Sequence, residues 1–308
     1  MKSGKRPEIK LWRVAIEVFV WLFLFQFVLA ATLSIGYVLE GNASEMGRRQ
    51  VLQFPNHRYL AWTGLCTLVI TMPFAGWIGT LAIRNHPLVK RMLKEGWTPI
   101  IVGFAGGLLL AVFSVCLVIL LGYGRIEAGP LRLAPPELAA SILGYGLVML
   151  VVGYYEELLF RGLLMIESIR RLRNREAGIT LTGLLFGLMH TVNIDGTPME
   201  HVRIVVSGIL FSWLLAVVML RFRSLRAAMG LHAGWNYGLA GLMGCVVSGH
   251  PANFTIFRTN VSGPAWVSGD SFGLETSLLV QFIVLLITVL LWRKTDFLLA
   301  TGDNDESD

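Results

Sequence analysis

The chain has 308 residues, of which 55% are hydrophobic and 15% are charged, and its formal net charge is +6. A soluble domain carries about 25% charged residues, so these figures exclude an ordinary soluble enzyme and a disordered chain, while 3 cysteines exclude a disulfide scaffold. The 33 glycines and 11 prolines suit a polytopic membrane protein, because both are commoner in membrane helices than in soluble ones. We therefore expect an all-α membrane helix bundle.

Eight apolar segments are candidates for membrane-spanning helices, each of which needs about 20 residues. In chain order they are Val14–Tyr37, Leu60–Ile83, Pro99–Leu121, Leu138–Phe160, Ile179–Val192, Val202–Leu220, Leu225–Val247 and Leu278–Trp292. The fifth and the eighth are short. The first follows a basic stretch, and its apolar core is long enough to favour an uncleaved anchor over a signal peptide.

The positive charges predict the orientation of these spans. Most of the 26 Lys and Arg residues precede the first span, follow the eighth, or lie in the loops after the second, fourth and sixth. Cytoplasmic loops carry this excess, so we expect both termini in the cytoplasm and the loop 248–276 on the opposite side. Orientation accounts for the net positive charge, and we expect no nucleic-acid partner. The acidic tail after Gly302 is expected to be solvated.

Charged residues at the end of the fourth predicted span form the first unusual polar cluster, since ionisable groups in a bilayer usually mark a function. Glu157 and Arg161 are four residues apart, so they share a helix face and can pair. Glu156 is rotated by about 100° from that face and stays free. Two adjacent carboxylates in different environments are how an acid/base group is made. A charge cluster that reaches out to water at the helix end is the structural alternative.

Two further polar clusters lie in the fifth and seventh predicted spans. His190 follows Gly183 and Gly187, which lie on a similar face and allow another helix to approach closely. His232 and Asn236 are four residues apart and point the same way, so they need partners within the membrane. A second ladder of small residues in the same helix consists of Gly230, Gly234 and Gly238.

The predicted topology places all three clusters in the cytoplasmic half of the bilayer. A Glu and a His can share one water, with the Glu as general base, and a second His with an Asn can stabilise the oxyanion of an attacked amide. This set favours acyl-group hydrolysis inside a membrane. There is no H-E-x-x-H and no G-x-S-x-G, although zinc held by Glu156, His190 and His232 remains chemically possible.

The three motifs, in this order on successive predicted helices, resemble those of a known family. They are Glu156-Glu157-x-x-x-Arg161, Phe186-x-x-x-His190 and His232-x-x-x-Asn236. The family is the CAAX protease and bacteriocin-processing family, also called the ABI or type II CAAX prenyl endopeptidase family, and it includes intramembrane glutamic proteases. The resemblance covers roughly a third of the chain, between about Leu138 and Val247.

The resemblance implies a role for each motif residue. Glu156 would be the general base that activates water, assisted by His190, and His232 and Asn236 would form the oxyanion hole. The residues implied to support this site are Glu157, Arg161 and Phe186. The resemblance also implies a reaction that uses no metal and no cofactor.

We therefore expect an intramembrane endopeptidase that hydrolyses a peptide bond in a protein or peptide substrate, within the cytoplasmic membrane of a prokaryote. The chain divides into residues 1–137 with three spans, a catalytic core 138–247, and residues 248–308 with a loop, the last span and the tail. Two other classes stay open. One is a non-catalytic membrane partner, such as an immunity or scaffold protein, and the other is a zinc-dependent membrane hydrolase or a transporter.

Overall fold

A computed structural model describes most of the chain after the second predicted span. The described residues are 73, 76–84, 86–94, 96–129, 134–252 and 255–293. The first predicted span, most of the second, and the acidic tail lie outside them.

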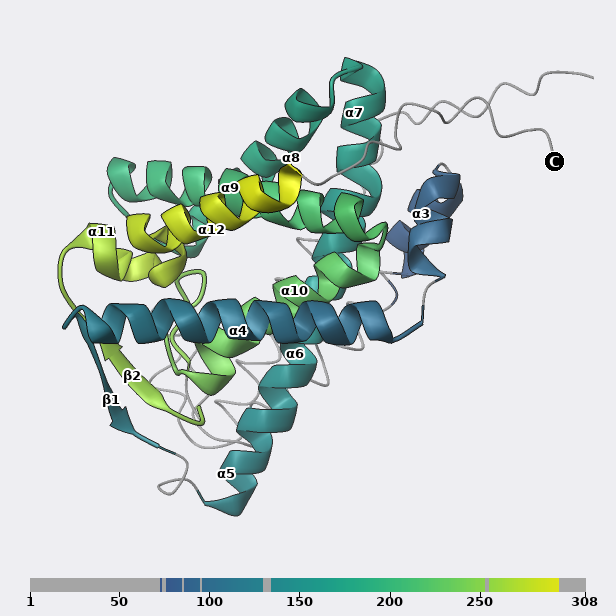
Figure 1. Cartoon of the computed structure of the whole chain (residues 1–308). Coiled ribbons are helices and arrows are strands. Elements are labelled where there is room, and N and C mark those ends of the chain that lie inside the picture. Colours follow the sequence, from purple (N-terminus) through teal and green to yellow (C-terminus); the bar gives the residue numbers. More distant parts are fainter. Residues whose placement is uncertain are drawn as a thin grey trace, which may run out of the picture.

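The described part is mostly helical (Figure 1). Its α-helices are α3 (Pro87–Leu93), α4 (Thr98–Leu120), α5 (Pro135–Ala139), α6 (Tyr145–Glu157), α7 (Ile166–Leu172), α8 (Arg175–His190), α9 (Pro198–Phe222), α10 (Leu225–Tyr237), α11 (Ala265–Ser268) and α12 (Leu278–Trp292). Wider π-helical segments are Ala140–Gly144, Leu158–Met165 and Gly238–Leu242. Single 3-10 turns are Thr191–Asn193, Asp270–Phe272 and Leu274–Thr276. Two strands complete the fold, β1 (Gly124–Ala128) and β2 (Arg258–Val261).

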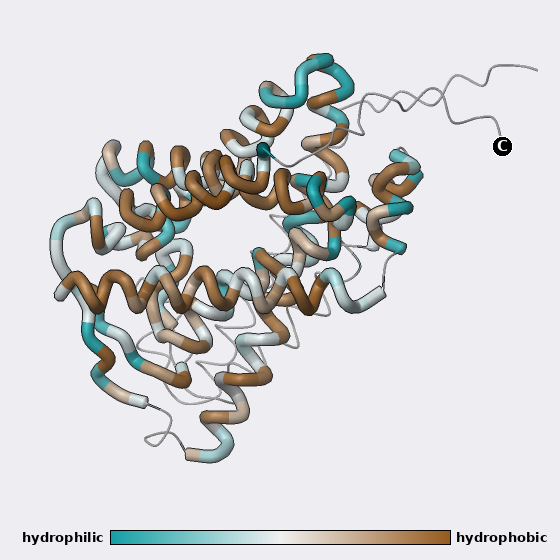
Figure 2. Tube along the Cα trace, viewed as in Figure 1, coloured by the Kyte–Doolittle hydropathy of each residue, from teal (hydrophilic) through white to brown (hydrophobic). Residues whose placement is uncertain are grey.

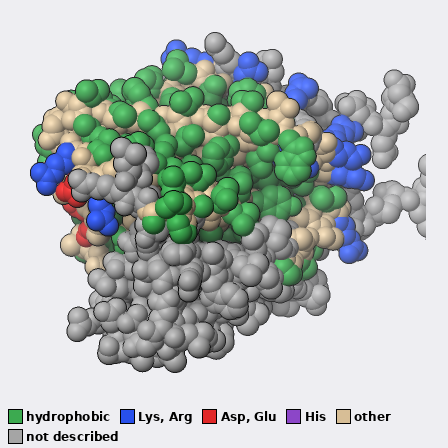
Figure 3. Space-filling model, turned by 90° about the horizontal axis from the view of Figure 1, so that it is seen from below, with side chains coloured by type: hydrophobic (Ala, Val, Ile, Leu, Met, Phe, Trp, Pro, Cys, Tyr) green, Lys and Arg blue, Asp and Glu red, His purple; other side chains and the backbone are tan. Residues whose placement is uncertain are grey.

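Among the described residues, three helices are long and apolar enough to cross a membrane, and α12 is a shorter apolar helix. The three are α4, α9 and the continuous helix Ile142–Leu172. Hydrophobic residues follow α4, α9 and α12 along their length (Figure 2), and in Figure 3 Lys and Arg side chains lie around the edges of a largely hydrophobic face. These helices support an integral membrane protein, and α4, α9 and α12 match three predicted spans closely. The number of eight spans stays a prediction.

The fourth predicted span was wrong at its end. The helix does not stop at Phe160 but passes through a π-helical segment and continues to Leu172. Glu157 and Arg161 are both 0% exposed, so this cluster lies inside the bundle rather than reaching water at a helix end. The prediction failed because two charges that neutralise each other inside protein do not end a helix.

The three clusters lie at different distances from the ends of their helices, and their common depth in the membrane stays a prediction. At 1.5 Å per residue, Glu156 lies about 24 Å from Leu172 and His190 about 22 Å from Arg175, while His232 lies only about 10 Å from Leu225. His190 is the last residue of α8, and the helix that begins at Leu225 ends at Leu242 instead of Val247. The clusters still meet, because α7 and the start of α8 project beyond the rest of the bundle (Figure 1).

The predicted small-residue ladders are confirmed as close helix contacts. A Cβ added at Gly230 or Gly234 would lie 2.1 Å or 2.0 Å from a backbone oxygen of α4. A Cβ added at Gly187 would lie 2.7 Å from Val205 Cα on α9. These glycines bring α10 against α4 and α8 against α9 with their backbones almost touching, which fixes the positions of His190 and His232.

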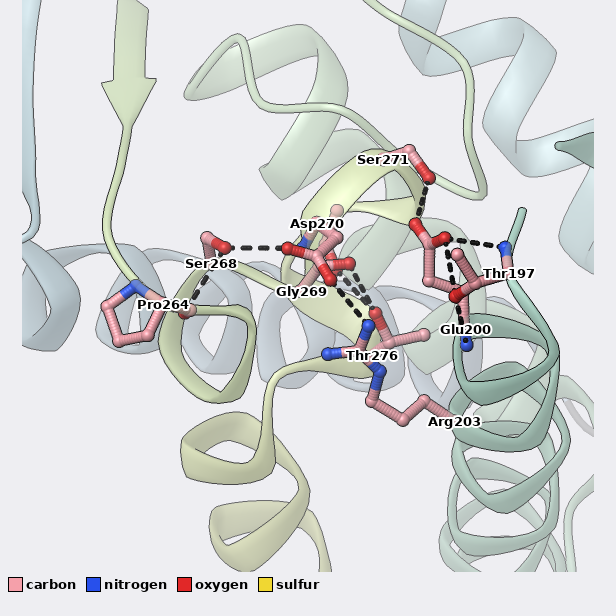
Figure 4. Close-up of polar contacts among 10 residues, drawn as sticks. Thr197, Glu200, Arg203, Pro264, Ser268, Gly269, Asp270, Ser271 and Thr276 are labelled. Atoms are coloured by element: carbon pink, nitrogen blue, oxygen red, sulfur yellow. Dashed lines mark hydrogen bonds and ion pairs between the residues drawn. The ribbon is translucent and has the colours of Figure 1, made fainter. Parts of the chain in front are cut away.

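The segment predicted as a long loop, 248–276, has structure of its own. Its strand β2 pairs antiparallel with β1, so the described part is not wholly helical. The rest of the segment returns to the start of α9 (Figure 4). There Ser271 Oγ donates to Glu200 Oε1 at 2.7 Å and Arg203 donates to Asp270 Oδ2. Inside the segment, Thr276 Oγ1 donates to Gly269 O at 2.7 Å. These contacts hold the segment against the helix bundle.

Candidate active site

A cavity of about 320 Å³ lies between α6, α8, α9, α10, α12 and the segment that follows α10. Most of its wall is apolar. The four predicted catalytic residues Glu156, His190, His232 and Asn236 all line it, as does Phe186. Residues far apart in the sequence therefore meet around one space, as the three motifs predict.

Glu157 and Arg161 lie behind this wall and form a buried chain with His232. Arg161 Nη1 donates to Glu157 Oε1 at 2.9 Å, across one turn as the spacing predicts. The same Oε1 lies 2.8 Å from His232 Nδ1. Because the Glu157 carboxylate can only accept a hydrogen bond, His232 Nδ1 carries the proton and donates it to Glu157. This fixes the orientation of the imidazole and leaves Nε2 directed to the other carboxylate.

Glu156 is the carboxylate on the cavity wall. Its Oε1 accepts from the hydroxyl of Tyr155 at 3.2 Å. Its Oε2 has no hydrogen bond from any described residue and lies 3.7 Å from His232 Nε2. Helix α10 therefore places a ring nitrogen of His232 opposite the free oxygen of Glu156. One oxygen held and one uncommitted is the arrangement a general base needs.

His190 is held by its own helix. Its Nδ1 lies 2.8 Å from the carbonyl oxygen of Phe186, and a carbonyl can only accept, so Nδ1 carries the proton. In a neutral ring Nε2 is then left as an acceptor. The Phe186 and His190 rings are in contact, with their centroids 4.4 Å apart. The Arg161 guanidinium lies 5.1 Å from the centroid of the Phe186 ring. No ion pair joins His190 to Glu156 in the described part of the chain, so a bridging water would have to connect them.

Asn236 lies one helical turn after His232 and is buried beside it on the cavity wall. Its Oδ1 has no hydrogen-bond partner among the described residues. A buried amide oxygen without a partner is unusual in a folded protein. The side chain is therefore available to a group that enters the cavity.

Sequence reasoning missed two residues that contact this cluster. Tyr155 bonds its immediate neighbour Glu156, a contact that helical spacing does not suggest because adjacent residues point apart. Phe211 on α9 packs against His232 with ring centroids 5.4 Å apart. An aromatic residue in an apolar helix gives no signal that distinguishes it from ordinary core.

A second polar cluster, formed by Ser248, His250, Glu275 and Asn193, lines the same cavity. Ser248 donates from its backbone N and its Oγ to the Glu275 carboxylate. Its carbonyl oxygen accepts from His250 Nδ1 at 2.8 Å and from Asn193 Nδ2 at 3.0 Å. Burial raises the pKa of Glu275, against the hydrogen bonds from Ser248, and burial lowers the pKa of His250.

No group of three or more His, Cys, Asp or Glu side chains in the described part of the chain is arranged to hold a metal ion. Glu156, His190 and His232 line one cavity but do not form such a group. The zinc alternative raised by the sequence therefore gains no support from the arrangement of its ligands.

The helices and the site define an integral membrane protein with a buried carboxylate and histidine cluster on an apolar cavity. Residues 138–238 match the family described as Type II CAAX prenyl endopeptidase Rce1-like. The match confirms the resemblance of the three motifs, each of which lies within it, and it supports a protease acting on a peptide or protein substrate. No curated protein and no solved structure matches the chain.

Proposed function

We propose that this protein is an intramembrane endopeptidase of the glutamic type, which hydrolyses a peptide bond without a metal. The observation that carries the proposal is the Glu156 carboxylate. It lines the cavity with one oxygen held by Tyr155 and the other uncommitted, 3.7 Å from His232 Nε2. The match to a protease family over residues 138–238 supports the same conclusion.

In the proposed reaction, Glu156 takes a proton from a water molecule in the cavity. The unprotonated Nε2 of His190 accepts a hydrogen bond from the other O–H of that water. This hydrogen bond orients the lone pair of the water oxygen. The water oxygen then forms a bond to the carbonyl carbon of the substrate, and the carbonyl π electrons move to the oxygen. When the intermediate collapses, the C–N bond breaks and the amine leaves with the proton from Glu156.

His232 and Asn236 would stabilise the oxyanion by hydrogen bonding. The Nδ1 proton of His232 is committed to Glu157, so Nε2 can donate only if the ring carries both protons. A doubly protonated ring and Arg161 then balance the two negative charges of Glu156 and Glu157. Charge balance thus favours the donor role for His232, because an unbalanced charge is expensive inside protein.

The experiment compares purified wild type with Glu156→Gln, which keeps the shape of the side chain and removes the base. Cleavage of a peptide library is measured with and without a chelator, and Glu127→Gln, an exposed carboxylate on β1, serves as the matched control. We expect loss of about 10²–10⁴-fold in rate for Glu156→Gln alone and no effect of the chelator. Equal rates for wild type and Glu156→Gln would refute the glutamic mechanism, and loss with chelator would favour zinc.

The cellular setting belongs to the same proposal. We propose a prokaryotic inner membrane with both chain termini in the cytoplasm, on the basis of the Lys and Arg distribution. Single cysteines placed near Arg223 and in β2, labelled from each side of sealed vesicles, test this orientation. Labelling of both positions from the same side would contradict it.

A further inference from the structure

The cavity has a second group of polar lining residues, most of which the family match does not cover. Ser248, His250 and Glu275 lie beyond residue 238, in the segment between α10 and α12, and all three line the same cavity as Glu156. The proposed hydrolysis uses none of them. Glu275 is a carboxylate in an apolar cavity and has no role in the proposed reaction, which suggests that it binds a ligand.

The polar groups that this part of the cavity wall offers to a ligand are hydrogen-bond acceptors. Glu275 supplies a carboxylate, and Gln281, which is 7% exposed, has an Oε1 without a partner among the described residues. Gln281 lies beside Glu275, because its Nε2 donates to the Glu275 carbonyl oxygen at 2.8 Å. His250 uses Nδ1 to donate to Ser248 O, so its neutral ring leaves Nε2 as a further acceptor.

No Lys or Arg side chain from the described residues balances this carboxylate, and its favourable electrostatic neighbours are His190 and His232 on the same cavity. None of the described residues that line the cavity is Lys or Arg, and in this part of the chain no ion pair joins Glu275 to a basic side chain. Glu275 differs in this respect from Glu157, which forms an ion pair with Arg161. A carboxylate that lines an apolar cavity without a Lys or Arg partner favours a positively charged or donor-rich ligand.

The backbone holds Glu275 in place from two sides. Ser248, which donates to the carboxylate, has a backbone φ of 50°. Residues other than glycine adopt this conformation rarely, and it is concentrated at functional sites. On the other side, the contacts of Ser271 and Asp270 with α9 hold the residues just before Glu275 against the bundle (Figure 4). Ser207 Oγ also donates to the carbonyl oxygen of Glu275.

We propose that Glu275 is a specificity-determining residue that binds a positively charged nitrogen of the substrate, while Glu156 acts on the peptide bond. The nitrogen belongs to a Lys or Arg side chain or to a free amino terminus. Gln281 Oε1 and His250 Nε2 are placed to accept its remaining protons. This inference rests on the proposed function for its substrate class, but it concerns binding and is tested apart from cleavage.

The test measures binding of short apolar peptides to the full-length Glu156→Gln protein in detergent by fluorescence anisotropy. The peptides differ at one position, which holds Lys, acetyl-lysine or Glu, and a parallel pair has a free or an acetylated amino terminus. We expect the charged-amine peptide of one pair to bind about tenfold tighter or more than its acetylated form. The pair that shows the difference identifies the source of the nitrogen.

Variants then assign the preference to Glu275. In the Glu156→Gln background, Glu275→Gln is expected to abolish the preference, Glu275→Asp to retain part of it, and the matched control Glu127→Gln to leave it intact. A preference that survives in Glu275→Gln overturns the proposal. So does tighter binding of the Glu peptide, because that would require a protonated Glu275 that donates.

Two outcomes are kept separate by this design. If wild type cleaves no peptide, the proposed function fails, yet the binding preference is still measured and decides the role of Glu275. If Glu275→Gln does not fold, the peptide pairs on the Glu156→Gln protein alone decide, and equal affinity for charged and acetylated forms overturns the proposal.

Discussion

Two polar clusters meet at one cavity, one fully buried behind its wall and one half-buried, and they are built on different principles. Around Glu157, Arg161 and His232 the charges are paired within the protein, and long helices that pack through glycines hold them. Around Glu275 the charge is held by the backbone and hydroxyl of Ser248 and has no basic partner among the described residues. The paired cluster is suited to a fixed geometry for chemistry, whereas the unpaired one is suited to receiving a charge from outside.

The largest expected effect is on the paired cluster. Arg161→Met leaves Glu157 as a buried carboxylate without its cation, and breaking such a pair destabilises a protein by about 3–5 kcal/mol. Thermal unfolding and the yield of monodisperse protein in detergent measure this loss. Arg170→Met, which removes a half-exposed arginine from Glu167, is the control and should change stability by less than about 1 kcal/mol. Similar losses in both would contradict a special role for the buried pair.

The next effect separates chemistry from folding. Asn236→Ala should lower kcat by about 10²–10³-fold with little change in KM, because an oxyanion donor acts mainly in the transition state. Stability should change little, since Asn236 Oδ1 has no protein partner among the described residues to lose. Asn260→Ala on β2, which removes an exposed amide bonded to Glu127, is the control. A rise in KM at unchanged kcat would place Asn236 in substrate binding instead.

A smaller effect is expected for the residue that holds the Glu156 carboxylate. Tyr155→Phe removes one hydrogen bond at 3.2 Å, worth about 0.5–1.5 kcal/mol, so kcat should fall by roughly 2- to 10-fold. Its neighbour Tyr154 does not line the cavity, and Tyr154→Phe should leave kcat unchanged. Equal effects of the two changes would show that the hydroxyl of Tyr155 does not position the base.

The smallest effect is expected on the segment that carries Glu275. Asp270→Asn weakens a partly exposed ion pair with Arg203, and such pairs contribute about 0.2–1 kcal/mol. The peptide preference assigned to Glu275 should survive, because Ser207, Ser248 and Gln281 still hold that residue. Loss of the preference with an unchanged melting temperature would show that the ion pair controls the cavity directly.

Helix spacing predicted much of the site. The pairing of Glu157 with Arg161, the shared face of His232 and Asn236, and the close approach at Gly187, Gly230 and Gly234 all follow from 3.6 residues per turn and are present. Helix ends were predicted less well. The length rule for a membrane span placed the end of the fourth helix at Phe160, because it treats charges as interface markers and cannot register that they are buried against another helix.

The sequence by itself determined the membrane class, the three motifs and the residues on each helix face, because local periodicity encodes these properties. Only the tertiary structure showed that His232 lies between the two carboxylates, with Nδ1 on Glu157 and Nε2 toward Glu156. It also brought Tyr155 to Glu156 and carried Glu275 into the same space. Contacts across 75 residues, such as that of Glu157 with His232, depend on how helices cross and on where a connecting segment folds back, and no local pattern records either.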